Sequence, residues 1–264
     1  MDSPPFTLVL SDIHCGGTTA LLPPDFETIE GQAVRQTAFQ KWLWGCWLEI
    51  KDWCTDHHDA YDLVVNGDAI EGMHHRTIQV WSPDPADHVN AAHHCLAPIA
   101  DMARKVYVVL GTEAHTGTFE HDLADRLGAE YADGKRRKAF DVLRLVYDGT
   151  RYKFCHHIST SSRPWTEAGR LSSALSAHQL VDVRRGAAMT QVLGCGHGHI
   201  YDFHGNATGL CVTGPGWQGP TRYVGRFAPH SGLEVGGYVL DRTHARPGGL
   251  PALVPLVWIA SDGK

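Results

Sequence analysis

The feature that most constrains the fold is a series of short apolar runs that alternate with stretches of helical spacing. Residues 6–10, 61–65 and 106–110 are apolar runs of strand length. Between them, residues 32–54 and 86–103 carry apolar side chains three and four positions apart, which is typical of amphipathic helices. This strand–helix–strand–helix–strand order predicts a layered α/β fold whose function lies at the strand ends.

The second half of the chain is richer in strands. Residues 140–147 and 151–156 flank an Asp-Gly-Thr sequence that is typical of a hairpin turn. Residues 167–181 have helical spacing, and an apolar run at 189–193 follows. Further strands are expected near residues 209–213, 236–240 and 252–259. This sheet is expected to be mixed or antiparallel. Because no repeat or linker interrupts the sequence, residues 1–264 are predicted to form a single domain.

Charge and hydropathy exclude two classes of protein. The net charge of −6 argues against a protein that coats nucleic acid through bulk positive charge. It leaves room for a phosphate-bearing substrate, because two divalent cations would add positive charge locally. The longest apolar stretch, residues 250–260, contains two prolines and is shorter than the roughly 18 residues of a membrane span. With no readable secretory signal, a cytoplasmic location is expected.

The seven cysteines form no CxxC pair, so neither a disulfide framework nor a zinc knuckle is indicated.

Histidine is unusually frequent, with 18 residues, and several histidines follow apolar runs together with aspartates. Asp12 and His14 follow the first run and, being two positions apart, project to the same side of an extended chain. Asp68 follows Gly67 after the second run, and its two carboxylate oxygens can bridge two ions. Carboxylate and imidazole together suit a borderline divalent metal.

Three further motifs follow later strands. Residues 111–115 read Gly-Thr-Glu-Ala-His, His156 and His157 end the strand at 151–156, and His197 and His199 belong to a Gly-His-Gly-His sequence. Strand alternation places His156 on the apolar face with Tyr152 and Phe154, whereas His157 shares the other, polar face with Arg151 and Lys153. His156 is therefore the expected ligand. Together the five motifs supply enough ligands for two metal ions.

The ordered set of motifs, each directly after an expected strand, resembles the calcineurin-like metallophosphoesterase family. The resemblance runs from residue 8 to about residue 200. It implies a four-layer αββα sandwich of two mixed β-sheets flanked by helices, with a dinuclear metal centre at the sheet ends. By position, it implies a first metal bound by Asp12, His14, Asp68 and His199, and a second bound by Asp68, as the bridge, with His156 and His197.

The chemistry that this resemblance implies is hydrolysis of a phosphoester. Two cations about 3.5–4 Å apart bind a bridging hydroxide, lower its pKa and hold a phosphoryl group for in-line attack. Mixed oxygen and nitrogen ligands without cysteine suit Mn, Fe or Zn better than Ca, with Mg a weaker candidate. The expected cofactors are therefore two divalent metal ions.

The third motif departs from the family pattern, which is Gly-Asn-His. Thr112 stands in place of the asparagine, Glu113 in place of the histidine, and His115 is displaced by two residues. We expect His115 to assist the leaving group, and Thr112, Glu113 or a water molecule to complete the second metal. The alternative is that the second metal site is incomplete and weak.

Other residues carry weaker signals. His74 and His75 follow Asp68 near the place where family members often have a substrate-contacting side chain, so they and His157 are candidates for binding the substrate. A pair of histidines on a surface loop is the alternative. Trp217 is expected either to stack on a base or a ring or to pack at the sheet edge. The basic run at 135–138 keeps a nuclease under consideration.

The leading hypothesis is a metal-dependent phosphatase or phosphodiesterase whose catalytic residues are His115 and Asp68. A nuclease of the same family is one alternative, with a nucleotide or nucleic acid as the substrate. A non-catalytic scaffold with this fold is another, suggested by the missing Asn-His pair and opposed by the retained ligands. A structural site for a single metal ion is the third. No membrane partner is expected, and the motifs do not specify the oligomeric state.

Overall fold

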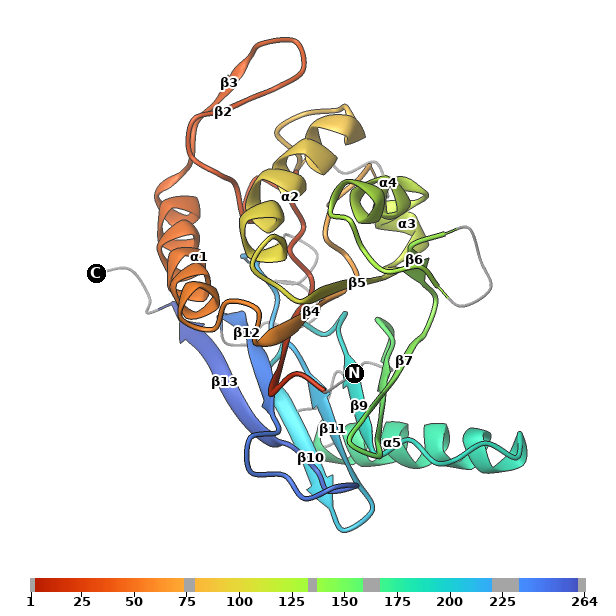
Figure 1. The fold of residues 1–264 in the computed structure, drawn as a ribbon. Coiled ribbons are helices and arrows are strands. Elements are labelled where there is room, and N and C mark those ends of the chain that lie inside the picture. Colours follow the sequence, from red (N-terminus) through yellow and green to blue (C-terminus); the bar gives the residue numbers. More distant parts are fainter. Residues whose placement is uncertain (1–2, 74–78, 133–136, 159–166, 220–232, 261–264) are drawn as a thin grey trace.

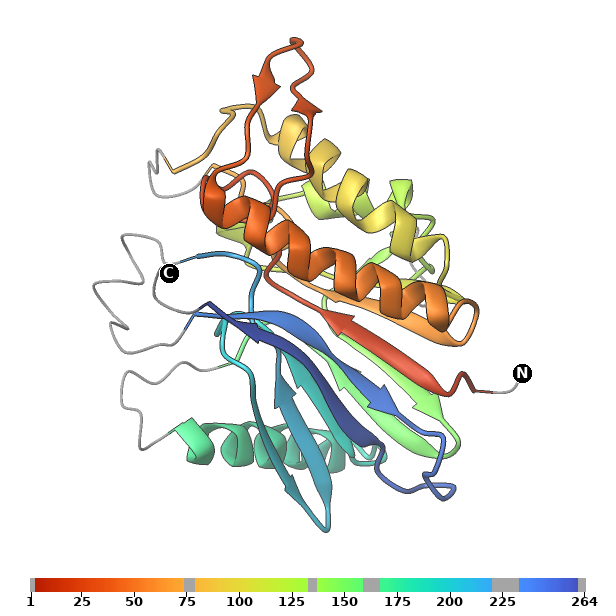
Figure 2. The ribbon, with the colours of Figure 1, turned by 90° about the vertical axis from the view of Figure 1, so that its left-hand side faces the viewer.

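Two β-sheets lie face to face between two layers of helices in the computed structural model (Figures 1 and 2). The structure describes residues 3–73, 79–132, 137–158, 167–219 and 233–260. Helices α1 (Ala38–Asp56) and α2 (Pro85–Ala100) cover the outer face of one sheet, and α5 (Glu167–Arg184) covers the outer face of the other. The predicted four-layer α/β sandwich is therefore confirmed.

The first sheet is mixed and contains the three strands expected from the first half of the chain. Its strand order is β13-β12-β1-β4-β5-β6, in which β1, β4, β5 and β6 are parallel neighbours and β12 is antiparallel to both β1 and β13. The strands are β1 (Phe6–Leu10), β4 (Tyr61–Asn66), β5 (Lys105–Val109), β6 (Ala139–Phe140), β12 (Glu234–Asp241) and β13 (Ala252–Ile259). The carboxyl ends of β1, β4 and β5 consequently meet at one edge of the sheet.

The second sheet is also mixed, with the order β10-β11-β9-β8-β7. Its strands are β7 (Leu143–Tyr147), β8 (Thr150–Phe154), β9 (Val192–Cys195), β10 (Asp202–Asn206) and β11 (Gly209–Thr213). The central strands β8, β9 and β11 are parallel, and each outer strand forms an antiparallel hairpin with its neighbour. The predicted turn between β7 and β8 is present, with Asp148 at φ 50° and Gly149 at φ 81°.

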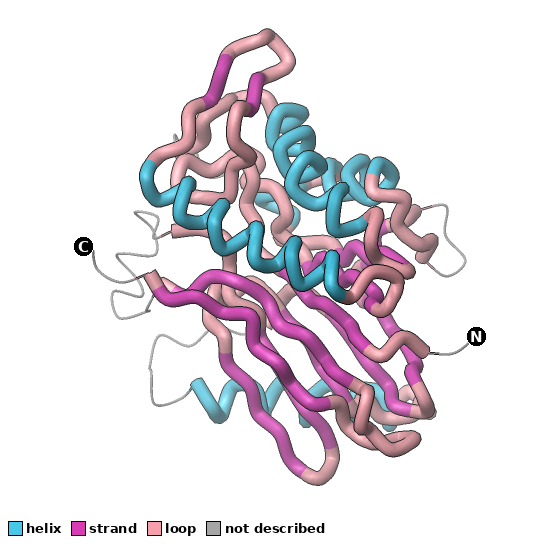
Figure 3. The backbone as a smooth tube through the Cα atoms, turned by 60° about the vertical axis from the view of Figure 1, so that its left-hand side comes forward, coloured by secondary structure: helices cyan, strands magenta, loops and turns pink. Residues whose placement is uncertain are grey.

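Helix boundaries differ from the sequence-based expectation at the first helix. The spacing predicted a helix from residue 32, but α1 begins at Ala38 because Thr37 caps it: the Thr37 side chain accepts from the Gln40 N–H, and the Gln40 side chain accepts from the Thr37 N–H. Residues 33–34 form β3 (Ala33–Val34), which pairs with β2 (Phe26–Glu27) in a hairpin that projects away from the sheets (Figure 3). Two short helices, α3 (Glu113–Thr116) and α4 (Phe119–Arg126), were not expected.

Strand alternation explains why four layers form. In β1, Leu8 and Leu10 pack with the helices α1 and α2, whereas Val9 packs between the two sheets. In the second sheet, Phe154 packs between the sheets and Leu193 packs beneath α5. Strands that are apolar on both sides must be covered on both sides, which excludes a two-layer arrangement.

The packing of the layers buries the side chains of Lys153 and Trp217. Lys153 was placed on a polar strand face, but α5 covers this face, and the buried Lys153 ammonium lies 3.1 Å from the Asp182 carboxylate of that helix. Trp217 is fully buried against Trp47, with ring centroids 4.8 Å apart, so it is a core residue that cannot stack on a base. Among the described residues, none of the helices is long and apolar enough to cross a membrane.

Candidate metal centre

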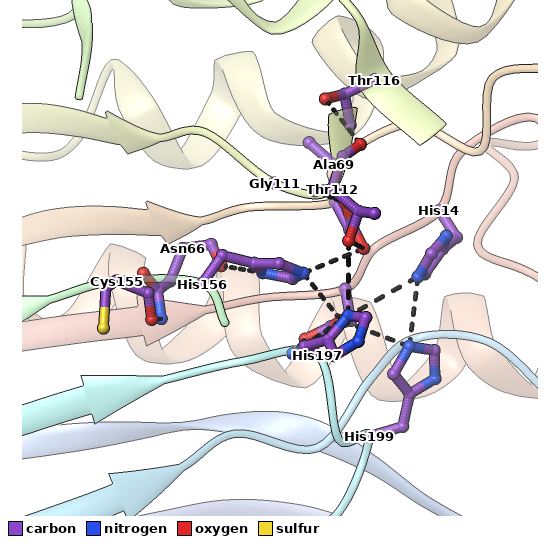
Figure 4. Close-up of polar contacts among 12 residues, drawn as sticks. His14, Asn66, Ala69, Gly111, Thr112, Thr116, Cys155, His156, His197 and His199 are labelled. Carbon is purple, nitrogen blue, oxygen red and sulfur yellow. Dashed lines mark hydrogen bonds and ion pairs between the residues drawn. The ribbon is translucent and has the colours of Figure 1, made fainter. Parts of the chain in front are cut away.

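The candidate ligands lie in loops that leave the carboxyl ends of neighbouring strands (Figure 4). The loops after β1 and β4 are joined by backbone hydrogen bonds, from Asp12 N–H to Gly67 O at 2.9 Å and from His14 N–H to Asp68 O at 2.9 Å. These bonds extend the parallel pairing of the two strands beyond their ends. The side chains of Asp12 and Asp68 are thereby brought to the same edge.

The first cluster consists of Asp12, His14 and His199, whose ligand atoms all lie within 4.8 Å of one another. His199 Nε2 lies 3.2 Å from Asp12 Oδ1 and 3.1 Å from His14 Nε2. Asp12 and His14 are buried, whereas the His199 side chain is 27% exposed. The cluster therefore opens to solvent on the side of His199.

Glu71 lies behind His14 and was missed by the sequence analysis. Its Oε2 is 2.8 Å from His14 Nδ1 and also accepts a 2.7 Å hydrogen bond from Gln218 Nε2. A carboxylate on one imidazole nitrogen fixes the ring and directs the other nitrogen toward the cluster. The only sequence signal was an acidic residue three positions after Asp68, and its contact with His14 depends on the fold.

Asp68 is held at the middle of the centre. Its Oδ1 accepts from the Thr112 N–H at 2.6 Å, and its Oδ2 lies 2.9 Å from His156 Nε2. Asp12, Asp68 and His156 form a second cluster by the same 4.8 Å criterion, so Asp12 belongs to both clusters. Asp12 also accepts from the His197 N–H at 3.0 Å, which ties the first sheet to the second at this edge.

The third cluster contains His156, His157 and His197. His156 Nδ1 donates to the Asn66 carbonyl at 2.8 Å, because a carbonyl oxygen only accepts, and this leaves Nε2 directed at Asp68. His197 Nδ1 lies 3.3 Å from Thr112 Oγ1. His157, expected at most to touch the substrate, lies instead among possible metal ligands.

Of the third sequence motif, Thr112 lies at the centre and Glu113 does not. Thr112 reaches the centre, where its hydroxyl donates to Asp68 Oδ2 at 3.1 Å. Glu113 is exposed and belongs to none of the three clusters formed by the described residues. His115 lies on α3, one turn after Thr112, and its side chain is outside the described part of the structure, as are His74 and His75.

Glu120 of α4 is a second buried acid that the sequence analysis missed. Its carboxylate accepts from the Ala69 N–H at 3.0 Å and from the Gly111 N–H at 2.6 Å. It therefore connects the loops that follow β4 and β5, which carry Asp68 and Thr112. Burial, with the nearby charge of Asp68, raises the pKa of Glu120 to about 7.

The backbone of the centre is strained at the candidate ligands themselves. Asp12, His14, Asp68, His197 and His199 all have positive φ, between 50° and 68°. Non-glycine residues adopt this left-handed region rarely and at an energetic cost. Five such residues in the three overlapping clusters indicate that the surrounding fold holds these residues in an unfavourable conformation, as is common at functional sites.

Glycines next to the ligands allow the close approach of the loops. A Cβ on Gly111 would lie 2.2 Å from the Asp68 nitrogen and also 2.2 Å from Asp68 Oδ1. A Cβ on Gly67, which has φ 84°, would lie 2.5 Å from His156 Nδ1. Space therefore requires both glycines, and the positive φ of Gly67 favours glycine there by conformation as well.

Charges within the centre shift the pKa values of its members. Burial opposes ionisation of Asp12, but His156 and His199 outweigh it and hold its pKa at about 2. Burial likewise disfavours protonated His14, yet Glu71 raises its pKa to about 9, and Asp12 and Asp68 raise that of His156 to about 10. The pocket is therefore strongly attractive to positive charge.

The donor atoms fit divalent metal ions. In the neutral rings, Nδ1 of His14 donates toward Glu71 and Nδ1 of His156 toward Asn66. The Nε2 lone pair of His14 then points at His199 Nε2, and that of His156 points at a carboxylate oxygen of Asp68. Such pairs repel unless a proton or a cation lies between them. Their separations of 3.1 and 2.9 Å suit ligands of one ion bound at about 2.0–2.2 Å.

The chain is similar to several solved structures over most of its length. YfcE, a phosphoesterase from E. coli, is 14% identical with a TM-score of 0.45, over 94% of this chain and 98% of that chain. An archaeal phosphodiesterase is 9% identical with a TM-score of 0.47, over 97% and 99%. Vps29 from Entamoeba histolytica, in a complex with zinc, is 10% identical with a TM-score of 0.42, over 89% and 85%. No protein-family model and no curated protein matches the chain.

The sheet orders, the four layers and the ligand clusters at the carboxyl ends of the strands define the class of fold. It is a four-layer α/β sandwich of two mixed β-sheets, which is the arrangement that the resemblance to calcineurin-like metallophosphoesterases implied.

Proposed function

We propose that this protein is a metal-dependent phosphoesterase that hydrolyses phosphomono- or phosphodiesters at a dinuclear centre. The observation that supports this function is the convergence of six side chains from the ends of four strands into overlapping clusters, which share Asp12 and His156. The six are Asp12, His14, Asp68, His156, His197 and His199.

In this proposal the residues divide between two ions. Asp12, His14 and His199 would hold the first, His156 and His197 the second, and Asp68 would lie between them. When bound, two divalent cations supply a nucleophilic hydroxide at neutral pH and neutralise the charge of the phosphoryl group. Mn, Fe and Zn are the proposed metals because the ligands are imidazoles and carboxylates.

The chain's own residues position the reaction. Thr112 and His156 hold the two oxygens of Asp68, which fixes the carboxylate between the two ligand sets. His199 is the exposed member of the first cluster, so the phosphoester would approach from its side. His115, on the helix that starts directly after Thr112, would donate a proton to the leaving oxygen.

Hydrolysis of two chromogenic esters tests this function. Metal-stripped protein is resupplied with Mn, Fe, Zn or Mg and assayed with p-nitrophenyl phosphate and bis-p-nitrophenyl phosphate, beside Asp68→Asn and His115→Ala. We expect metal-dependent turnover that Asp68→Asn abolishes and that His115→Ala lowers by about 10²-fold or more. The preferred ester separates a monoesterase from a diesterase, and cleavage of single-stranded DNA would indicate a nuclease.

If the protein binds one ion or none and hydrolyses neither ester with any metal, the dinuclear enzyme is wrong. A non-catalytic scaffold with this fold would then be the better explanation. Two bound ions without turnover of these esters would restrict the substrate range, and natural nucleotides would be assayed next.

A further inference from the structure

We infer that His157 is a ligand of the second metal ion and takes the place of the asparagine that the third motif lacks. The inference rests on the dinuclear centre proposed above and concerns how this chain completes it. The second ion would then be held by Asp68, His156, His157 and His197.

The geometry places three imidazoles around one point. Ring nitrogens of His156, His157 and His197 all lie within 4.8 Å of one another. The ring centroid of His157 is 5.2 Å from that of His156 and 5.1 Å from that of His197. His156 already presents Nε2 to Asp68, because its Nδ1 donates to the Asn66 carbonyl. The two other rings therefore adjoin the His156 ring, whose Nε2 is fixed toward the centre.

The end of β8 explains how two successive histidines reach the same cluster. In a continuing strand, His157 would point to the side of Lys153, beneath α5. The strand instead ends at Phe154 and the chain bends at His156, whose carbonyl accepts from the Gly196 N–H at 2.9 Å. Beyond this bend strand alternation no longer applies, and the His157 ring lies beside those of His156 and His197.

The other candidates for this position are less suitable. The Thr112 hydroxyl and N–H both donate to Asp68, so Thr112 already has a task in fixing the bridging carboxylate. Glu113 is exposed and lies outside the three clusters of described residues. His157 is exposed enough to adjust its ring, and neutral imidazole is a good ligand for Zn or Fe.

A consequence for metal preference follows from the ligand types. Three imidazoles and one carboxylate favour Zn or Fe at the second position over Mg, which prefers oxygen ligands. The first position, with two imidazoles and two carboxylates, is richer in oxygen. We therefore expect the two positions to differ more in their affinity for Mg than in their affinity for Zn.

Metal binding measured without any turnover tests the role of His157. Metal-free protein is titrated with Zn²⁺ by calorimetry and with Co²⁺ by visible absorption. We expect wild type to bind two ions and His157→Ala to bind the second at least about tenfold more weakly, because loss of even an indirect contact costs 10–100-fold. His157→Gln should behave in the same way. His58→Ala, which removes an exposed histidine beside Asp59, is the matched control and should bind as wild type does.

The outcomes separate this inference from the proposed function. Two ions in wild type with unchanged binding in His157→Ala overturn the ligand role of His157 and leave the phosphoesterase proposal intact. Weaker binding of the second ion in Thr112→Ala but not in His157→Ala assigns the position to Thr112 and also overturns the inference. One ion or none in wild type overturns both proposals. Recovery of the second ion in a His157→Ala/Thr112→Asn double variant would support the inference strongly.

Discussion

The Nδ1 atom of His14 lies 2.8 Å from Oε2 of Glu71, with both side chains buried at the edge of the first sheet. The opposite nitrogen of the same ring faces His199. This relationship makes His14 a preoriented ligand, because the carboxylate fixes both the tautomer and the ring plane.

Glu71→Gln should weaken binding of the first metal ion. The variant keeps an acceptor oxygen but loses the charge that orients His14, so we expect about 10–100-fold lower affinity. Calorimetric titration of metal-free protein measures it. Glu27→Gln, at an exposed position in the β2–β3 hairpin, is the control. Unchanged affinity in Glu71→Gln would show that His14 does not depend on this carboxylate.

The metal-free protein should become less stable as pH rises from 6.5 to about 9. The pKa of His14 is about 9 in the folded chain, against an ordinary value of 6.5, despite burial and because of Glu71. Within this window the folded state keeps a proton that the unfolded state has released, so the stabilisation is full below pH 6.5 and disappears above pH 9. The slope is at most about 1.4 kcal/mol per pH unit for each such histidine.

Urea unfolding at several pH values measures this effect. His14→Asn should show a smaller decline, although His156, whose pKa is raised to about 10, still contributes. Metal affinity should change in the opposite direction and increase with pH, because both imidazoles must lose a proton to bind an ion. If the free energy of unfolding of the metal-free protein is constant from pH 6.5 to 9, the raised pKa of His14 is wrong.

Gly111→Ala should disrupt the centre. The new Cβ would lie 2.2 Å from backbone and carboxylate atoms of Asp68, so the loop after β5 must move and the bridging carboxylate must move with it. We expect metal binding to fall by at least about tenfold. Gly45→Ala is the matched control, because its Cβ meets nothing within 4 Å in the middle of α1. That variant should gain about 0.5–1 kcal/mol of stability.

Glu120→Ala should lower the free energy of unfolding by about 1–3 kcal/mol for each N–H that it leaves without an acceptor. These are the Ala69 and Gly111 N–H groups. Denaturant unfolding of the metal-free protein measures the loss. Because the same bonds position the loops that carry Asp68 and Thr112, metal affinity should fall too. A variant as stable as wild type would show that water replaces the carboxylate.

Much of the fold could be predicted because strands and long helices show a regular spacing of apolar residues in the local sequence. The apolar runs became β1, β4 and β5, and the Asp148-Gly149 turn joins β7 and β8 as its left-handed residues require. Short elements without a period, such as α3, α4 and the β2–β3 hairpin, were missed. A segment of two to eight residues carries too few apolar positions to display a period.

The sequence by itself determined which residues could bind metal, because Asp12, His14, Asp68, His156, His197 and His199 each follow a strand and strand ends converge in an α/β fold. Only the tertiary structure decided what surrounds them. Glu71 meets Gln218 across 147 positions, and Glu120 meets Ala69 across 51. His157 joined the cluster through a bend that ended strand alternation. Ligand types are local properties of a chain, whereas their supporting partners depend on strand order and on the loops that it brings together.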